Sequence, residues 1–322
     1  MFIKSLMSGM HQNAKKVSQE SKRAYLTCLA DIIWCGIVYG ASPNNYNKFD
    51  FYRIDATKRA TYVTNRISNR MIQKYNHPDY RPLFEDKDVF AEKFSDVFRR
   101  DWLLFPNCTQ QAYKSFVANK SRFICKPLDG SQGLGIEVID GHIPSYQELV
   151  DRLSGNSYIL EEYIVQHEAL DAYYADAINC IRIITVLKNG KVYPVVANIT
   201  FSAGHQIANA SFGGITCEID ISTGEVVTDG GAYGHQLYKN HPCTNVPFKG
   251  FVIPYWDKIL TMLDDIGSRI PEVGYVGWDV AIAQDGPIVI EGNTSPGYTF
   301  FQIPQLLPNQ IGVMDKYAPF LD

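Results

Sequence analysis

Two short apolar segments joined by a tight polar turn, within residues 277–297, constrain this chain most. A Gln-Asp-Gly-Pro sequence at residues 284–287 separates them. A turn this short pairs the segments as antiparallel strands, so the start of the first lies beside the end of the second. We therefore expect Asp279, Glu291 and Asn293 to converge at one end of a hairpin.

The three side chains of this hairpin carry oxygen atoms, the ligands that hard divalent cations prefer. Mg²⁺ takes few protein carboxylates and completes its shell with water and nucleotide phosphates. So sparse a set therefore predicts a metal–nucleotide site rather than a metal cage made by protein alone. A hairpin with polar ends and no metal is the alternative, because Asp and Asn are common where strands end.

A second segment places a lysine before a glycine-rich loop. Residues 122–127 form a short apolar strand that carries Lys126, and a further strand follows the loop. Free backbone N–H groups in such a loop can close over phosphate, while Lys126 supplies a mobile positive charge. The loop is not a Walker A sequence, since no Gly-Lys-Ser/Thr follows and it leads into a strand. Its candidate phosphate contacts are Gly130, Ser131, Gly133 and Gly135.

A third segment, residues 158–168, is an apolar strand that ends in paired acids. Exposed backbone in a connector of this kind can pair with an adenine edge. A solvated acidic strand end is the alternative interpretation. The candidate nucleotide contacts here are Glu161, Glu162, Tyr163, Ile164 and Glu168.

The order of these segments, ending in Asp279 and Glu291-x-Asn293, resembles that of the ATP-grasp superfamily of carboxylate-amine ligases. The ending EGNTSPG at residues 291–297 is similar to that of D-alanyl-D-alanine ligases. A closer similarity, from about Tyr39 to Gly297, is to the sugar-transfer-associated ATP-grasp family. It is carried by YGASP at residues 39–43, GGI at 213–215, IDISTG at 219–224, HPCT at 241–244 and GFVIPYW at 250–256.

The resemblance implies an α+β ATP-grasp fold in which two lobes clasp ATP. Residues 86–160 and 161–322 would form the lobes, after a mainly helical region at residues 1–85. It also implies a role for each candidate residue. Lys126 and the earlier Lys87 would contact the phosphates, under the loop from Gly130 to Gly135. The segment 161–164 would hold adenine, Glu168 the ribose, and Asp279, Glu291 and Asn293 the magnesium ions.

The chain departs from the family pattern in two places. Many relatives have an arginine two residues before the first metal aspartate, where this chain has Gly277. Arg182 is the expected substitute, because an arginine in so apolar a strand is costly to bury without an anion. An edge-strand position is the alternative. The N-terminal region also lacks βαβ alternation, and the spacing of apolar residues in 55–75 and 86–98 instead indicates helices.

The composition of the chain limits the classes of partner that it can bind. The chain has 322 residues, a net charge of −4 and dispersed basic residues, which argues against a nucleic-acid surface. Seven cysteines without metal-type spacing indicate reduced thiols in a cytoplasmic protein. No apolar stretch is long enough to span a membrane, so we expect a soluble protein without stable membrane insertion. The sequence leaves the oligomeric state open.

The resulting hypothesis is an ATP- and Mg²⁺-dependent carboxylate-amine ligase that forms an amide through an acyl phosphate. Arg182 and Lys126 would be its catalytic residues. The small-molecule carboxylate, a uronic acid or an amino acid, and the sugar-linked context rest on family association alone. A phosphotransferase and a non-catalytic nucleotide-binding protein are the alternatives. His205 and His241 are either substrate contacts or loop hydrogen bonds.

Overall fold

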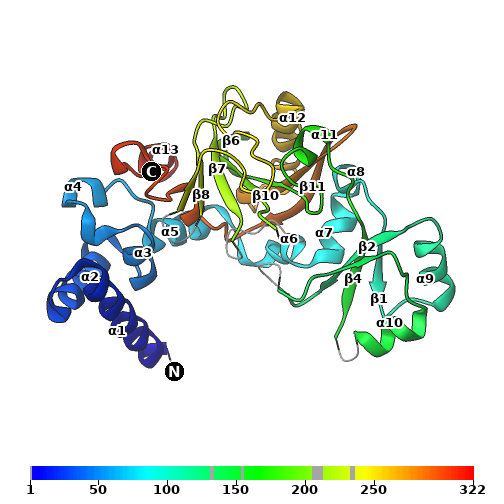
Figure 1. Cartoon of the computed structure of the whole chain (residues 1–322), viewed down its shortest axis with the longest axis horizontal. Helices are drawn as coiled ribbons and strands as arrows, with labels where there is room; N and C mark the ends of the chain where they lie inside the picture. Colours follow the sequence, from blue (N-terminus) through cyan, green and yellow to red (C-terminus); the bar gives the residue numbers. More distant parts are fainter. Residues whose placement is uncertain (1, 131–133, 154–155, 205–212, 233–235) are drawn as a thin grey trace. The chain divides into compact units, whose positions relative to one another are not determined.

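The computed structural model describes residues 2–130, 134–153, 156–204, 213–232 and 236–322. Figure 1 traces the chain and labels its elements. Two compact units make up the structure: Met1–Asn76 with Ser295–Asp322, and His77–Thr294. Each unit is described by itself below. Within the described ranges, none of the helices combines the length and apolar composition that a membrane span requires.

The first unit is mainly helical, as the sequence predicts. Ser42 caps α3 by accepting a hydrogen bond from the Asn45 amide, and Gly40, with φ at 65°, ends α2 in the left-handed conformation. The predicted helix at residues 55–75 is two helices, separated by residues 60–64. The helices of this unit are α1 (Phe2–Ser21), α2 (Tyr25–Tyr39), α3 (Pro43–Lys48), α4 (Ala56–Arg59), α5 (Asn65–Tyr75) and α13 (Met314–Tyr317).

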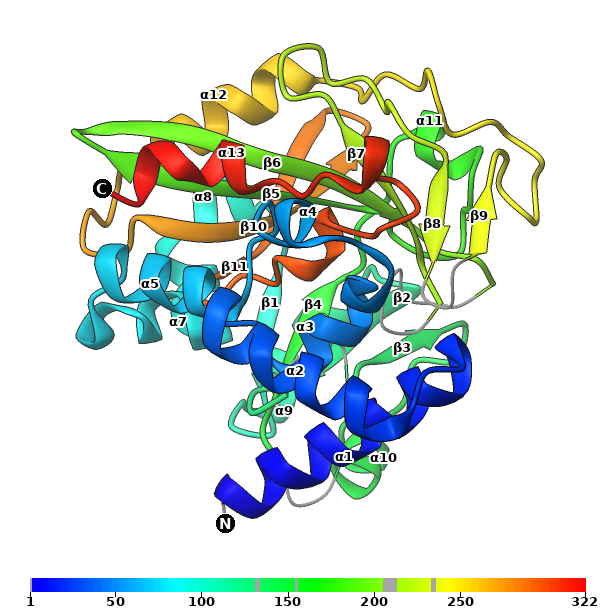
Figure 2. The same ribbon diagram turned by 90° about the vertical axis from the view of Figure 1, so that its left-hand side faces the viewer.

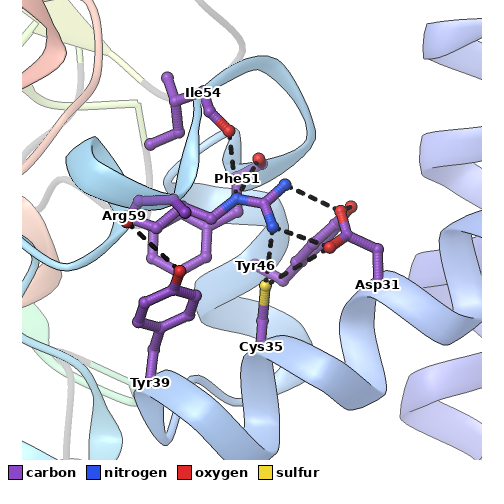
Figure 3. A network of polar contacts seen from close by, with 8 residues as sticks. Asp31, Cys35, Tyr39, Tyr46, Phe51, Ile54 and Arg59 are labelled. Carbon is purple, nitrogen blue, oxygen red and sulfur yellow. Dashed lines mark hydrogen bonds and ion pairs between the residues drawn. The ribbon is translucent and has the colours of Figure 1, made fainter.

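A partly buried ion pair joins these helices (Figure 3). Arg59 donates to both carboxylate oxygens of Asp31, at 2.7 and 2.8 Å, and Tyr46 donates to the same carboxylate at 2.6 Å. The Arg59 Nε donates to the Phe51 carbonyl at 2.8 Å. Burial raises the pKa of the neighbouring Cys35 thiol to about 12, so this cysteine is no nucleophile. The network fixes α2 against the chain that follows it.

In the second unit, a four-stranded antiparallel sheet has the order β1-β4-β2-β3. Its apolar cluster includes Phe105, Tyr113, Phe123 and Leu149. Ser145 and Glu148 form a capping box at the start of α10, which the Ser-Tyr-Gln-Glu sequence at residues 145–148 predicts. The elements are β1 (Trp102–Phe105), β2 (Arg122–Pro127), β3 (Glu137–Asp140), β4 (Tyr158–Glu162), α9 (Gln110–Val117) and α10 (Tyr146–Arg152).

The same unit holds a seven-stranded antiparallel sheet with the order β11-β10-β5-β6-β7-β8-β9. Antiparallel sheets with helices segregated beside them are typical of the α+β class, which confirms the predicted fold class. The strands are β5 (Cys180–Lys188), β6 (Lys191–Phe201), β7 (Ile215–Ile219), β8 (Gly230–Ala232), β9 (Gln236–Tyr238), β10 (Tyr275–Ala283) and β11 (Gly286–Asn293).

One face of the seven-stranded sheet is apolar. Trp278 is fully buried there and contacts the rings of Phe84 and Phe94. Helix α12 contributes Leu263 to the same core and packs alongside β6, as Figure 2 shows. The remaining helices of this unit are α6 (Pro82–Glu85), α7 (Lys87–Lys93), α8 (Ser95–Phe98), α11 (Glu168–Asp171) and α12 (Trp256–Ile266). The opposite face carries polar side chains.

Candidate active site

Five polar side chains form a row across the seven-stranded sheet. In the strand register, Glu218 is opposite Asn198, Asn198 is opposite Arg182, Arg182 is opposite Asp279, and Asp279 is opposite Glu291. Residues directly opposite in an antiparallel sheet share a face. The row therefore brings the predicted metal carboxylates and the predicted arginine together on the polar face.

A β-bulge places Glu291 in this row. Asp279 pairs with Glu291 and Val280 with Val289, so Ile290 is the extra residue of β11. Without the bulge, two-residue alternation would put Glu291 on the face of Val289, which belongs to the apolar core. The bulge re-aims the glutamate toward Asp279. Asn293, two residues on, pairs with Gly277.

Arg182 and Asp279 form a two-point ion pair. The Arg182 Nε donates to Asp279 Oδ1 at 2.6 Å, and Nη2 donates to Oδ2. Strand β5 lies between β10 and β6, so the edge-strand alternative for Arg182 is wrong. The arginine instead pairs directly with the aspartate that lies two residues after Gly277.

The pKa values of Asp279 and Glu291 are shifted in opposite directions. Burial raises the pKa of Asp279 to about 6, although Arg182 opposes this and Glu291 adds to it. Burial also acts on Glu291, but the charge of Arg182 and a hydrogen bond from Asn293 Nδ2, at 3.0 Å, hold its pKa below the usual value. The buried Asp279 and the half-buried Glu291 thus share the charge of Arg182, and Lys126 also acts on Glu291. Such a site favours an additional cation.

A second charged group lies between β2, β4 and β11. The Lys126 Nζ donates to Glu161 Oε2 at 2.8 Å, and the Arg100 Nε donates to the same oxygen at 2.7 Å. Arg100 also donates to the carbonyl oxygen of Val289 at 2.9 Å and to that of Ile290 at 3.2 Å. Ile290 is the extra residue of the bulge, and Val289 directly precedes it. Burial raises the pKa of Glu161, but the charges of Arg100 and Lys126 outweigh it and the net pKa is lowered.

Lys87 approaches the glycine-rich loop from the first turn of α7. Its Nζ donates to the carbonyls of Leu128 at 2.9 Å and Gly130 at 2.7 Å. Burial lowers the pKa of Lys87; Glu291 opposes this, whereas Lys126 reinforces it. Both predicted phosphate lysines thus lie within electrostatic reach of each other and of Glu291.

The conformation of the glycine-rich loop requires a glycine at position 135. Gly135 has a φ of 73°, and a Cβ there would lie 2.9 Å from the Pro127 ring, so a side chain is excluded by both conformation and space. Ser131 and Gly133 lie outside the described residues.

The side chains of the acidic connector, residues 161–168, lie in different surroundings. Glu162 accepts a hydrogen bond from the Asp101 amide at 3.1 Å, and the Tyr163 ring lies under the Arg122 guanidinium. Ile164 packs in an apolar cluster with Ala281, Ala283, Ile288 and neighbouring isoleucines. Glu168 is exposed at the start of α11. Because Ala281 lies two residues along β10 from Asp279, this cluster adjoins the row on the same face.

Three charged or polar residues of this region escaped the sequence analysis. Arg100 had no local signal, since its partners Glu161 and Val289 are distant in sequence. Asn198, 3% exposed, interrupts an apolar strand as Arg182 does, and the same argument would have found it. Glu218 is found only through the register of β6 and β7.

One of the two candidate histidines, His241, lies in the described part of the chain. The His241 ring is buried, with Nε2 at 2.6 Å from the Ser202 carbonyl oxygen and Nδ1 accepting from the Cys243 amide at 3.4 Å. These are loop contacts of the kind that the sequence offered as one alternative. His205 lies outside the described residues.

Among the described residues, no cluster of three or more His, Cys, Asp or Glu side chains could hold a metal ion. Asp279, Glu291 and Asn293 instead offer two carboxylates and an amide. This donor set suits an ion that completes its shell with water and phosphate oxygens.

Comparison with curated proteins finds no match. Solved structures with a similar arrangement include the ATP-grasp ligase PsnB complexed with precursor peptide PsnA2 and AMPPNP, at 14% identity and a TM-score of 0.43 over 71% of this chain and 56% of that one. D-alanyl-alanine synthetase A from Vibrio cholerae matches at 11% identity and a TM-score of 0.48, over 77% and 67%. The chain thus spans little more than half the length of the PsnB structure.

The sequence profile described as sugar-transfer associated ATP-grasp matches residues 66–314, well over half of the chain. The match includes Lys87, Lys126, Arg182 and the hairpin from β10 to β11. It confirms the resemblance that the sequence motifs predict: this chain belongs to the sugar-transfer associated ATP-grasp family.

Proposed function

We propose that this chain is an ATP-dependent carboxylate-amine ligase. The observation that carries the proposal is the convergence of Arg182, Asp279 and Glu291 on one sheet face, with Lys126 and Lys87 within electrostatic reach of Glu291. Phosphoryl transfer asks a protein chiefly for positioning and for positive charge around the moving oxygens. Cations beside paired carboxylates supply both.

Magnesium fits the donor set of the hairpin. Asp279 is buried and Glu291 is half-buried, their carboxyl groups share the charge of Arg182, and Asn293 donates to Glu291. These three residues would hold the ion, which would offset charge on the nucleotide phosphates. Arg182 uses both oxygens of Asp279, but each carboxylate oxygen can accept more than one partner, so the ion and the arginine can share the group.

The nucleotide would bind between the row that contains Arg182 and Asp279 and the charged group around Glu161. Lys126 and Lys87 would contact its phosphates, and the loop with Gly130, Ser131, Gly133 and Gly135 would cover them. The connector at residues 161–164 would hold adenine with its backbone, Ile164 and its apolar cluster would face the ring, and Glu168 would accept from the ribose. Glu161 keeps Lys126 in place, since Arg100 fixes the same carboxylate.

The proposed reaction has two steps. An oxygen of the substrate carboxylate attacks the γ-phosphorus of ATP, the bond to the β-phosphate oxygen breaks, and ADP leaves. An amine nitrogen then attacks the acyl carbon, phosphate leaves with the former carboxylate oxygen, and the amine loses a proton. Arg182 would stabilise negative charge on the transferring group. Closure of the site would protect the acyl phosphate from water.

The substrates are proposed at the level of class. A small carboxylic acid, such as a uronic acid or an amino acid, and an amine would react in the cytoplasm, and the family name favours a sugar-linked precursor of a surface polysaccharide. The two lobes would comprise residues 86–160 and 161–322, after the helical region at 1–85.

A phosphotransferase is the second candidate. Its support is Gly277, which stands where many ligases of the superfamily have an arginine. Such an enzyme would use the same nucleotide site and release a stable phosphorylated product. A non-catalytic nucleotide-binding protein would need no buried cation and carboxylate row and is less well supported.

Product identification separates these functions. The full chain is incubated with ATP, Mg²⁺ and pooled sugar acids, amino acids and amines, and new species are identified by mass spectrometry. The ligase predicts a product whose mass is the sum of one acid and one amine less one water. A product that retains the phosphoryl group, or ATP that stays intact with every pool, would overturn the proposal.

A further inference from the structure

Helix α2 is apolar over most of its circumference, and Asp31 is its one charged residue. Cys28, Ile32 and Cys35 are buried within the first unit. The opposite face is defined here as the α2 stripe: Leu26, 73% exposed, Ile33, 42%, Trp34, 58%, and Ile37, 66%. At 100° per residue, this stripe centres about 180° from the buried side chains. Apolar helix faces are normally covered, and the α2 stripe is exposed.

The exposure is concentrated on this helix. Of the twelve large hydrophobic side chains exposed in the described part of the chain, five lie on α2, with Val38 as the fifth. Single exposed apolar residues are common on protein surfaces, but a contiguous stripe marks an interaction site. The α2 stripe therefore has the character of an interaction surface.

Charge indicates what the occupant is. Residues 1–40 contain five basic side chains, Lys4, Lys15, Lys16, Lys22 and Arg23, and two acidic ones, Glu20 and Asp31, for a net charge of 5 − 2 = +3. The chain as a whole carries −4, so residues 41–322 carry −4 − 3 = −7. Of the two acids, Asp31 is already bound by Arg59. Residues 41–75 add seven basic and two acidic side chains, a net charge of 7 − 2 = +5, so residues 76–322 carry −7 − 5 = −12. The α2 stripe thus belongs to a cationic N-terminal region of a chain that is anionic beyond it.

Exposed cations lie in and beside the helix pair. Lys22 and Arg23 occupy the turn directly before α2, and Lys15 and Lys16 are exposed on α1. Aliphatic residues, a tryptophan and flanking lysines are the composition of helices that lie in the headgroup region of anionic bilayers. At 15 residues, α2 is shorter than the ~20 residues that a span requires, so it would lie along the surface.

A second copy of the chain is a weaker occupant. A 15-residue helix is about 22 Å long, and one face of it covers far less than the ~800 Å² per partner of a stable interface. The basic turns of two copies would add no attraction. We propose that the α2 stripe docks on an anionic phospholipid surface, with Lys15, Lys16, Lys22 and Arg23 facing the lipid phosphates.

Vesicle co-sedimentation of the full chain tests the proposal. Binding is expected to phosphatidylcholine vesicles that contain phosphatidylglycerol, and it should weaken with salt and on pure phosphatidylcholine. Ile37→Asp and the double change Lys22→Glu with Arg23→Glu should each lower the partition coefficient at least about tenfold. Val252→Asp is the matched control, since Val252 is 57% exposed but lies in the second unit, and it should bind as the unchanged chain does.

Trp34 gives a second readout that needs no substitution. It is the most exposed of the four tryptophans, since Trp256 and Trp278 are buried and Trp102 is half-buried. Brominated lipids in the anionic vesicles should quench its fluorescence, and Trp34→Phe should remove that quenching. Absence of both sedimentation and quenching would overturn the proposal. So would a dimer in light scattering that Ile37→Asp converts to a monomer without any vesicle binding, because the occupant would then be a second copy.

Discussion

Arg182 lies directly opposite Asp279 in adjacent strands and donates to both oxygens of its carboxylate. The arginine is thus anchored beside the proposed metal site from a neighbouring strand, although Gly277 lacks a side chain at the position two residues before the aspartate. A guanidinium held in this way can face a phosphoryl group without leaving the aspartate, because its remaining N–H groups point elsewhere.

Replacing Arg182 by lysine should damage catalysis more than the fold. A point charge fails to reproduce the planar fork that contacts Asp279 and the transferring group together, so we expect kcat to fall about 10²-fold or more. Steady-state ADP release measures the effect. Activity within a factor of two of the unchanged enzyme would remove Arg182 from the proposed mechanism.

Glu291→Gln should abolish turnover while the protein stays folded. The substitution keeps the shape of the side chain but removes a charge from the proposed Mg²⁺ site, and we expect a loss of about 10²-fold or more in ATP consumption. Glu92→Gln, on the exposed side of α7, is the control and should be silent. ATP consumption that survives Glu291→Gln unchanged would reject the site.

Lys126→Met should weaken nucleotide binding about tenfold or more, because a charge-assisted phosphate contact is lost. Lys120→Met is the control: Lys120 pairs with Asp101 and lies outside the phosphate loop. Calorimetric titration with ATP and Mg²⁺ compares the two variants. Equal affinity and equal turnover would contradict the role given to Lys126.

Substitutions at the adjacent Arg99 and Arg100 should lower the free energy of unfolding by different amounts. Arg100 is 2% exposed in its side chain and binds the buried Glu161, so Arg100→Met should cost about 3–5 kcal/mol by leaving that charge with Lys126 alone. Arg99 pairs with Asp285 at the surface, and Arg99→Met should cost only about 0–1 kcal/mol. Denaturant unfolding checks both values, and similar costs would show that the buried pair is not structural.

The contribution of Glu161 should depend on pH in a defined direction. Its pKa is held below the usual 4.5, so its ion pairs stabilise the folded protein above that pH and are lost as the pH falls through the folded-state pKa. The destabilisation caused by Glu161→Gln should therefore be largest near neutrality and shrink below about pH 4.5. Thermal unfolding at a series of pH values measures it, and a cost that grows toward acid would contradict this assignment.

Local patterns in the sequence were enough to predict the β10–β11 hairpin, the capping box at Ser145 and the strand that carries Lys126. Each is encoded by contiguous residues, through alternation, turn chemistry or a capping sequence. The helix predicted for residues 55–75 was only partly right, because helical spacing alone does not reveal the break at residues 60–64.

Features that depend on strand register or on distant partners escaped prediction. The bulge at Ile290 is set by how β11 pairs with β10, and an alternating pattern alone would have turned Glu291 into the core. Arg100 is buried because Glu161 and the β11 carbonyls accept its hydrogen bonds, and all of these are far away in sequence. Pairing of Asn198 with Arg182 likewise follows from the strand order.

Oxygen transfer from the acid to phosphate tests the central claim most directly. Once product analysis has identified the acid and the amine, the acid is supplied with ¹⁸O in its carboxylate and the phosphate released is analysed by mass spectrometry. A ligase that proceeds through an acyl phosphate must deliver one ¹⁸O atom to each inorganic phosphate that it releases. Labelled phosphate should appear only when the amine is present, in an amount equal to the ADP formed. Release of unlabelled phosphate, or ADP formation without the amine and with a stable phosphorylated acid, would contradict the account.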